Sequence, residues 1–392
     1  MLYSDYTEEL TGLKDVIVSF VERKDNVLHL HITMEQRIHV CPRCGERTSK
    51  VHDYHKQEVK DISSFGQFTI IHLRKRRHVC PVCRKKFYEN VDFLPKYHRI
   101  TNRLYSYILN EFTETRSMKS IARSNNISQT SAARAVDHVS YTPAELPEVL
   151  SIDEFRGNSG GVKFQCILTD PANKKVFDIL PTRSQEYLYW YFSKFKDRKN
   201  VKFVVMDMYK SYKLMAKTLF PNATVIVDKY HFSRMVTWAF ERVRIEEQKK
   251  FSDYRRKAFK NSRSILLKHS DSLTLEEIRQ VEGMLSASEK LRHAYIIKEN
   301  FEIFMKCKDS QSARKQLGYW NMYAMNYDLP EFENVAKTFS RWSKEILNSF
   351  DYPYTNGYTE GCNNKIKVLK RVSYGMPNFD RFRSRIMHTM AH

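Results

Sequence analysis

The sequence has few glycines and prolines, no long apolar run and no low-complexity segment. Glycine and proline each occur only 11 times in 392 residues, so the linkers between elements are expected to be short. No apolar run approaches the roughly 18 residues that are needed to span a bilayer. The first ten residues, MLYSDYTEEL, carry acids and lack the apolar core of a signal peptide. We therefore expect a cytoplasmic protein without a membrane partner.

Acidic residues are outnumbered by basic ones. The chain has 66 Lys and Arg residues against 45 Asp and Glu residues, which gives a formal net charge of +21. An excess of this size favours a polyanionic partner, with nucleic acid as the first candidate and an anionic membrane surface as the second. The chain length is enough for roughly two to four domains.

In a cytoplasmic protein the seven cysteines are not expected to form a disulfide framework, because thiols stay reduced in that compartment. Four of them form two CxxC turns, Cys41–Cys44 and Cys80–Cys83. Thiolates from two such turns suit tetrahedral zinc, and four protein ligands leave no open position, so the ion is expected to be structural. Two alternatives are buried free thiols and a redox pair. Four nearby histidines are alternative ligands: His39, His52, His55 and His78.

A strongly basic segment surrounds the second CxxC turn. Seven Lys and Arg residues crowd a window of 13 residues, which is either a solvated face or a surface that binds DNA phosphates. Beside a zinc module we favour phosphate contact. The expected contact residues are Arg74, Arg76, Arg77 and Lys85.

Residues 117–136 fit two short helices joined by a tight turn. Asn125 or Asn126 can take the left-handed conformation that the turn needs, and Ser128 can cap the second helix. That helix would present four side chains to a major groove: Gln129, Thr130, Ser131 and Arg134. Many helical hairpins of this kind do not touch DNA, but the neighbouring basic zinc module favours a helix-turn-helix.

An α/β segment follows Pro143 and Pro147. Strands are expected at 149–153, 163–170, 174–180, 202–207 and 223–228, with helices at 184–196 and 211–219. This order implies an α/β sheet with an antiparallel edge. The chain from about 232 to 348 is helical in pattern, and one more basic helix lies within 357–392.

Two aspartates end apolar strands in this segment, Asp153 and Asp207. Carboxylates at the carboxyl ends of neighbouring strands face the crevice where such sheets bind ligands. Glu360 begins a helix whose one face also carries Asn364, Lys367 and Arg371. Hard oxygen ligands suit magnesium or manganese, and two such ions can assist an in-line phosphoryl displacement. The alternative is that each aspartate only caps a strand end.

Other residues around these carboxylates have candidate roles. Asp228 also ends a strand, and His231 follows it by one helical turn, so both are candidates for supporting roles, as is Asn364. Basic residues near the site are expected to bind phosphates: Lys210, Lys367, Lys370 and Arg371. Further basic residues, Arg381, Arg383 and Arg385, would extend this face or form solvated surface.

The sequence resembles the insertion-sequence transposases of the ISL-three family. The matching blocks are the paired CxxC turns, LSIDEFR (150–156), VVMDMYKSY (204–212), VDKYHF (227–232) and the long block at 356–386. The resemblance implies an RNase H-like catalytic domain with a DDE triad, here Asp153, Asp207 and Glu360, and a helical insertion between the second aspartate and the glutamate.

Five segments are expected on this basis: a zinc-binding DNA-binding module at 1–95, a helix-turn-helix at 96–143, the first part of the catalytic domain at 144–234, an all-α insertion at 235–345, and the second part of the catalytic domain at 346–392.

The expected function is DNA transposition. The chain would bind the terminal inverted repeats of an insertion sequence, then cleave and transfer DNA strands with two Mg²⁺ or Mn²⁺ ions. A homodimer on double-stranded DNA in a bacterial cytoplasm, associated with the nucleoid, is the expected setting. Two alternatives remain: a metal-dependent nuclease of the same fold, and a non-catalytic regulator that uses the zinc module and the helix-turn-helix.

Overall fold

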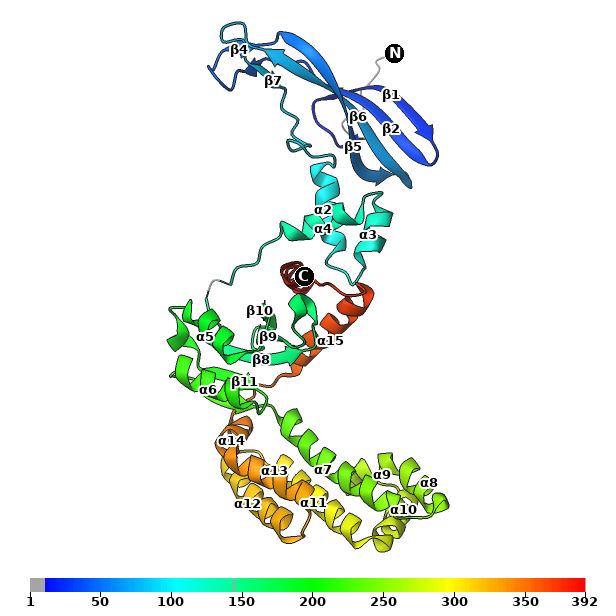
Figure 1. Cartoon of the computed structure of the whole chain (residues 1–392), viewed down its shortest axis with the longest axis vertical. Coiled ribbons are helices and arrows are strands. Elements are labelled where there is room, and N and C mark those ends of the chain that lie inside the picture. The colour runs from blue at the N-terminus through cyan, green and yellow to red at the C-terminus, as the bar shows by residue number, and fades with distance from the viewer. Residues whose placement is uncertain (1–10, 144, 392) are drawn as a thin grey trace. The chain divides into compact units, whose positions relative to one another are not determined.

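A computed structural model describes residues 11–143 and 145–391 of the chain (Figure 1). The chain divides into two compact units, one formed by residues 1–141 and 367–392 and the other by residues 142–366. Within the described residues, no helix combines the length and the apolar character that a membrane crossing requires.

The first unit begins with a twisted sheet of five strands. Its hydrogen-bonded order is β1-β2-β6-β5, with β7 paired to β6, and β2 runs parallel to β6 while the other pairs are antiparallel. A separate two-stranded sheet, β3-β4, carries the first CxxC turn. The strands are β1 (Val16–Lys24), β2 (Val27–Met34), β3 (His39–Val40), β4 (Arg47–Thr48), β5 (Val51–Ser64), β6 (Gln67–Val79) and β7 (Lys86–Tyr88).

Alternation of apolar and polar residues explains why this sheet has one buried face. In β2 every second residue is buried, from Leu28 to Met34, and the intervening histidines are half-buried. Ile71 and Leu73 of β6 pack in the same apolar cluster. Alternating apolar and polar residues at 27–32 and 67–73 predict a strand in each range. β6 extends six residues beyond the second range, which carries the sheet directly into the second CxxC turn.

Helices complete the first unit: α2 (Asn102–Glu111), α3 (Met118–Ser124), α4 (Gln129–Asp137) and α16 (Phe379–Met390). Leu104, Ile108 and Ile121 form a small buried core with residues of α4. Arg385 of α16 is only 1% exposed, and it donates hydrogen bonds to backbone carbonyls that include Phe112 and Glu114. The expectation that Arg385 extends a basic surface is therefore wrong, because its guanidinium joins α16 to the end of α2.

The second unit contains a mixed five-stranded sheet in the order β10-β9-β8-β11-β12. β8, β11 and β12 are parallel, whereas β9 and β10 run antiparallel along one edge, as the sequence predicts. The elements of this part are β8 (Val149–Phe155), β9 (Gln165–Asp170), β10 (Lys175–Leu180), α5 (Gln185–Ser193), β11 (Phe203–Met206), α6 (Lys210–Leu219) and β12 (Thr224–Val227); η1 (Ser159–Gly161) and η2 (Arg198–Asn200) are short 3-10 turns.

Helices fill the chain between β12 and the last segment of the unit. They are α7 (Lys229–Lys249), α8 (Asp253–Asn261), α9 (Arg263–Leu267), α10 (Leu275–Ala287), α11 (Glu289–Met305), α12 (Ser310–Asn326), α13 (Pro330–Arg341) and α14 (Ser343–Asp351), with the 3-10 turn η3 (Ser270–Ser272). Buried aromatic rings hold this group together, among them Phe301, Trp320 and Phe339. The amide of Asn348 in α14 donates to the carbonyl of Val225 in β12 over 2.7 Å, which fixes the helices to the sheet.

The helix α15 (Gly357–Val372), whose residues up to 366 belong to the second unit, begins against the sheet. Four buried polar side chains fix that start. Ser151 of β8 donates to Asn356 over 2.6 Å and lies 2.8 Å from the hydroxyl of Thr359, which lies 2.8 Å from the hydroxyl of Thr169 in β9. Because these groups are withdrawn from water, each hydrogen bond constrains the position of the helix on the sheet.

Candidate metal and catalytic sites

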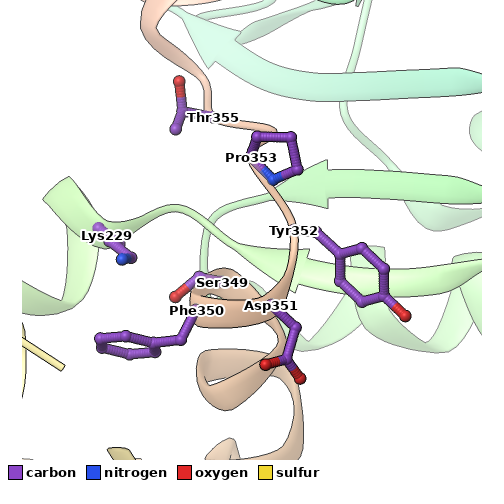
Figure 2. Close-up of a pocket in the computed structure, with 7 residues that line it drawn as sticks. All are labelled: Lys229, Ser349, Phe350, Asp351, Tyr352, Pro353 and Thr355. Atoms are coloured by element: carbon purple, nitrogen blue, oxygen red, sulfur yellow. The ribbon is translucent and has the colours of Figure 1, made fainter. Parts of the chain in front are cut away.

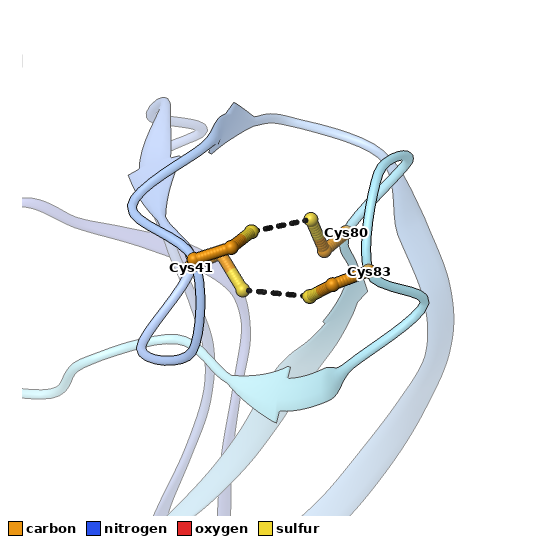
Figure 3. Close-up of side chains that lie close together, drawn as sticks. Cys41, Cys80 and Cys83 are labelled. Atoms are coloured by element: carbon orange, nitrogen blue, oxygen red, sulfur yellow. Dashed lines mark hydrogen bonds between the residues drawn. The ribbon is translucent and has the colours of Figure 1, made fainter.

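Four cysteine sulfurs converge at the end of the first sheet (Figure 3). The Sγ atoms of Cys41 and Cys83 lie 3.5 Å apart, as do those of Cys44 and Cys80, and all four lie within 4.8 Å of one another. A Zn–S bond of about 2.3 Å places the sulfurs of a tetrahedral site about 3.8 Å apart. The four thiols therefore fit a zinc ion with a small adjustment.

Both CxxC turns have the same backbone geometry. The amide of Gly45 donates to the carbonyl of Cys41 over 3.0 Å, and the amide of Arg84 donates to that of Cys80 over 3.1 Å. Gly45 and Arg84 both have a positive φ, 76° and 58° respectively. Gly45 adopts this conformation without strain because it has no side chain. Because the turns match, each presents its two sulfurs in the same way.

Backbone donors favour ionisation of one of these thiols. Burial opposes ionisation of Cys41, but the backbone amides of Arg43 and Cys44 outweigh it and lower the pKa of Cys41 to about 6. Cys44 also has a backbone donor, Glu46, but the neighbouring sulfurs of Cys83 and Cys80 outweigh it and raise the pKa of Cys44 to about 12. Because zinc binds the thiolate form, the lowered pKa of Cys41 favours metal binding, whereas zinc would have to displace the proton of Cys44.

The predicted phosphate-binding residues of this module differ in solvent exposure and in whether they form ion pairs. Arg74 is exposed and its guanidinium lies 3.9 Å from the centre of the Tyr54 ring, and Lys85 is exposed as well. Arg77 is half-exposed and pairs with Asp53. The side chain of Arg76 is only 12% exposed, because it pairs with Glu89 and donates to the carbonyl of Met34 over 2.7 Å. Arg76 thus stabilises the sheet and offers little to a phosphate.

The helix-turn-helix has the predicted turn and cap. Asn126 adopts the left-handed conformation with φ 50°, and the hydroxyl of Ser128 accepts a hydrogen bond from the amide of Ser131 at the start of α4. Gln129, Thr130 and Arg134 are all exposed, whereas the apolar residues of α4 are buried against α2 and α3. The second helix therefore has a free polar face of the kind that enters a major groove.

Three neighbouring parallel strands of the second unit each lead into an aspartate. Met206 of β11 pairs with Ile152 of β8 and with Val227 of β12, so the next residues of the three strands form one row. These next residues are Asp153, Asp207 and Asp228. Because parallel strands end at the same sheet edge, the register places three carboxylates side by side.

Burial and mutual repulsion perturb these carboxylates. Burial, together with the charges of Asp207, Glu154 and Glu360, raises the pKa of Asp153 to about 7. Burial and the charge of Glu154 likewise raise the pKa of Asp207 to about 6. The Oδ1 atom of Asp207 is buried and has no hydrogen-bond partner among the described residues. Such groups are costly to ionise until a cation neutralises them.

Glu360 lies in the first turn of α15 beside the end of the row. Its carboxylate, that of Asp228 and the ring of His231 offer ligand atoms that lie within 4.8 Å of one another. Burial and the charge of Glu360 raise the pKa of Asp228. Burial and the nearby Arg234 lower the pKa of His231 to about 4, so its imidazole is neutral near pH 7. A neutral imidazole is the form that binds metals.

Asn363, which the helical-face argument did not select, contacts the first aspartate directly. Its side-chain amide donates to Oδ2 of Asp153 over 2.8 Å, and Asn363 is buried. Asn364, the predicted supporting residue, is exposed. A residue three positions after Glu360 lies on the same helical face as a residue four positions after it. The sequence alone therefore could not distinguish Asn363 from Asn364, and the contact with the sheet decides between them.

The predicted phosphate-binding bases near this site are mostly at the surface. Lys210 begins α6 and is exposed, Lys367 and Arg371 of α15 are exposed, and Lys370 is half-buried. Glu154, the acid next to Asp153, pairs with Arg183 and so brings a positive charge near the row.

A separate open cavity of about 350 Å³ lies where α14 leads into the segment before α15 (Figure 2). The ammonium group of Lys229 lies 4.0 Å from the centre of the Phe350 ring in its lining. Its lining residues are Lys229, Ser349, Phe350, Asp351, Tyr352, Pro353 and Thr355, which include none of the four clustered carboxylates. The perturbed carboxylates therefore mark the chemical site better than this cavity does.

Comparison with known proteins supports each part of this architecture. Three family models match the chain in order: "zinc-finger of transposase IS204/IS1001/IS1096/IS1165" at residues 37–83, "Helix-turn-helix domain of transposase family ISL3" at 89–140, and "Transposase" at 150–386. The zinc ribbon and the helix-turn-helix are thereby confirmed, and the four cysteines support structural zinc.

Individual relatives agree with the family models. The chain is 24% identical to the transposase for insertion sequence element IS1001 of Bordetella parapertussis, over 97% of both chains. It is 23% identical to the transposase for insertion sequence element IS1557 of Mycobacterium tuberculosis, over 40% of both chains. A Lactococcus lactis protein called "ATP-dependent protease" is 35% identical, but over only 29% of this chain. The chain therefore belongs to transposase family ISL3 and is a DNA transposase.

Proposed function

We propose that this transposase cleaves and joins DNA strands with two divalent metal ions, magnesium or manganese, held by Asp153, Asp207 and Glu360. The observation that carries the proposal is the row of carboxylates at the ends of three parallel strands, faced by Glu360 from α15. Oxygen ligands of this kind suit Mg²⁺ and Mn²⁺. The raised pKa values and the unpartnered Oδ1 atom of Asp207 fit a cation there.

We further propose that the sheet is RNase H-like and that the helices between β12 and α15 are an insertion into it. The strand order, with three parallel strands next to two antiparallel ones, supports this assignment. On this proposal 1–95 is the zinc module, 96–143 the helix-turn-helix, 144–234 and 346–392 the two parts of the catalytic domain, and 235–345 the insertion between them. Of the last segment, residues from 367 onward belong to the first compact unit.

The bound ions would activate the attacking oxygen and stabilise the leaving oxygen of an in-line displacement at phosphorus. Asp153, Asp207 and Glu360 supply the negative charge that holds cations next to a polyanion. Asn363 holds the carboxylate of Asp153 in one orientation. Lys210, Lys367, Lys370 and Arg371 are proposed to bind flanking phosphates, since all four lie on elements that begin at the carboxylate row.

Asp228 and His231 are proposed as additional ligands or supporting groups on the Glu360 side of the site. The Nε2 atom of His231 is buried without a hydrogen-bond partner among the described residues, which leaves a neutral nitrogen available. Changing His231→Gln should therefore weaken Mn²⁺ binding more than Mg²⁺ binding, because nitrogen ligands suit manganese better than magnesium. Equal effects on the two ions would contradict a direct ligand role.

The proposed substrates are the two ends of an insertion sequence. The zinc ribbon and the helix-turn-helix would bind terminal inverted repeats through Arg74, Arg77, Lys85, Gln129, Thr130 and Arg134, and a homodimer would hold two ends at once. Water would attack at the element end, and the freed 3′-hydroxyl would then attack target DNA.

The experiment that tests this proposal uses DNA with the inverted repeats that flank the gene, a target plasmid and Mg²⁺. We expect wild type to cut the ends and join them, and Asp153→Asn, Asp207→Asn and Glu360→Gln each to lose both activities. Glu148→Gln is the matched control. Glu148 directly precedes β8, the strand that carries Asp153, at the end away from the carboxylates, and its side chain forms a surface ion pair with Lys202.

Three outcomes would contradict parts of the proposal. Variants that cleave at the wild-type rate would refute the triad. Wild type that cuts but never joins would favour a nuclease of the same fold. Binding without any cutting would favour a DNA-binding regulator.

A further inference from the structure

The two CxxC turns belong to a longer repeat. Residues 39–44 and 78–83 read His-Val-Cys-Pro-Arg-Cys and His-Val-Cys-Pro-Val-Cys, so a histidine stands two residues before each first cysteine. Because the turns also match in backbone geometry, His39 and His78 occupy equivalent positions. Their ring centroids lie 4.5 Å apart. The repeat therefore creates a histidine pair beside the four sulfurs.

His78 is fully buried, with 0% of its surface exposed. Neither ring nitrogen has a hydrogen-bond partner of standard geometry among the described residues, although one nitrogen faces the carbonyl of Lys50. A buried ring nitrogen without a hydrogen-bond partner is unfavourable, so His78 has a nitrogen available to a ligand. Metal-binding histidines commonly direct the second ring nitrogen at a backbone carbonyl, as His78 does.

Glu89 adds a carboxylate to this pair. It is 3% exposed, and its oxygens accept from the backbone amide of Arg76 over 2.6 Å and from the Arg76 guanidinium over 3.1 Å. Each carboxylate oxygen can accept more than one interaction, so these bonds leave lone pairs free. Ligand atoms of His39, His78 and Glu89 lie within 4.8 Å of one another.

We propose that His39, His78 and Glu89 bind a second zinc ion next to the four-cysteine site. Two imidazoles and one carboxylate form a ligand set that zinc accepts, and three protein ligands leave a fourth position for water. Arg76 opposes a cation here, but Glu89 neutralises its charge. Four thiolates around one zinc ion carry a net charge of about −2, which favours a second cation nearby. The second ion would hold β3, β6 and the end of β7 together.

The test is the zinc content of the full-length chain after reconstitution with zinc and removal of loosely bound metal. We expect two zinc ions per chain in wild type and one in His39→Ala and in His78→Phe, which keeps a ring of similar size. His98→Ala is the control, because His98 is an exposed histidine of the same unit, and it should retain two.

Cobalt distinguishes the two sites. The first equivalent should give the strong thiolate-to-cobalt absorption of the cysteine site in wild type and in both variants. The second equivalent should bind wild type alone and add no thiolate band. One zinc ion per wild-type chain, or two in His39→Ala and His78→Phe, would overturn the proposal. If His78→Phe does not fold, His39→Ala decides, since His39 is only half-buried. None of these readings depends on DNA cleavage.

Discussion

The side-chain amide of Asn363 donates a hydrogen bond to Oδ2 of Asp153 over 2.8 Å, and both residues are buried. The other oxygen of Asp153, Oδ1, accepts from the backbone amide of Glu154 over 2.8 Å. The first carboxylate of the proposed site is thus held on both oxygens, from its own strand and from α15. Asn363 lies one turn after Glu360 on α15. This helix therefore fixes the position of the Glu360 carboxylate relative to the Asp153 carboxylate.

Removing this contact should impair cleavage without removing a metal ligand. We expect Asn363→Ala to lower the cleavage rate by about 10- to 100-fold and to raise the Mg²⁺ concentration needed for half-maximal rate, because groups that orient a ligand have effects of this size. The measurement is cleavage rate against Mg²⁺ concentration. A purely structural role would lower the rate without moving the Mg²⁺ dependence. Asn334→Ala, on an exposed face of α13, is the control.

The raised pKa of Asp153, about 7, predicts a stability effect of one sign. The folded state favours the protonated carboxyl, so this stabilisation is complete below the unfolded pKa of about 3.8 and is lost as pH rises through about 7. Asp153→Asn should therefore stabilise the chain at pH 8.5 relative to wild type, by up to about 4 kcal/mol, and hardly at all at pH 4.

Thermal unfolding of wild type and Asp153→Asn at several pH values, without added magnesium, measures this difference. Added Mg²⁺ should raise the melting temperature of wild type more at pH 8.5 than at pH 6, because ligands bind metal in their ionised form. A melting temperature that is equally insensitive to pH in both proteins would contradict the assignment of the shift to Asp153.

The four-cysteine cluster should be needed for DNA binding but not for the fold of the second unit. We expect Cys83→Ser to lose the thiol-bound zinc, to expose the first unit to proteases and to weaken DNA binding on the order of tenfold or more, as phosphate contacts are lost. Zinc analysis, limited proteolysis and DNA titration measure these effects. Cys307→Ser, at a thiol that donates to the carbonyl of Ile303 in α11, should resemble wild type. Unchanged zinc content in Cys83→Ser would contradict the cluster.

Arg134 tests the helix-turn-helix. Its side chain is exposed on α4, the proposed recognition helix. Arg134→Ala should weaken binding to the inverted repeats and, if the contact is to a phosphate, reduce the salt dependence of binding by about one charge. Fluorescence anisotropy at several salt concentrations measures both. An unchanged slope with relaxed sequence preference would indicate a base contact instead. Arg314→Ala, exposed on α12, serves as control.

Periodic patterns made much of the fold predictable. Alternation in residues 27–32 predicts the strand β2, and the nearly continuous apolar run at 202–207 predicts β11 as a buried strand. The cap at Ser128 and the left-handed turn at Asn126 followed from local hydrogen-bond chemistry. Such features depend on neighbours in sequence, so a single sequence carries them.

The spacing of the cysteines and the position of each aspartate after a strand could likewise be recognised from the sequence alone. The partners of individual side chains could not be predicted from it. Arg76 and Arg385 belong to basic segments, yet Glu89 and backbone carbonyls bind them, because contacts between distant segments decide whether a charge faces water. The register Ile152–Met206–Val227 and the buried hydroxyls that fix α15 brought Asp228 and Asn363 to the site. Only the tertiary structure could decide this, since register and helix docking depend on packing between residues up to 210 positions apart.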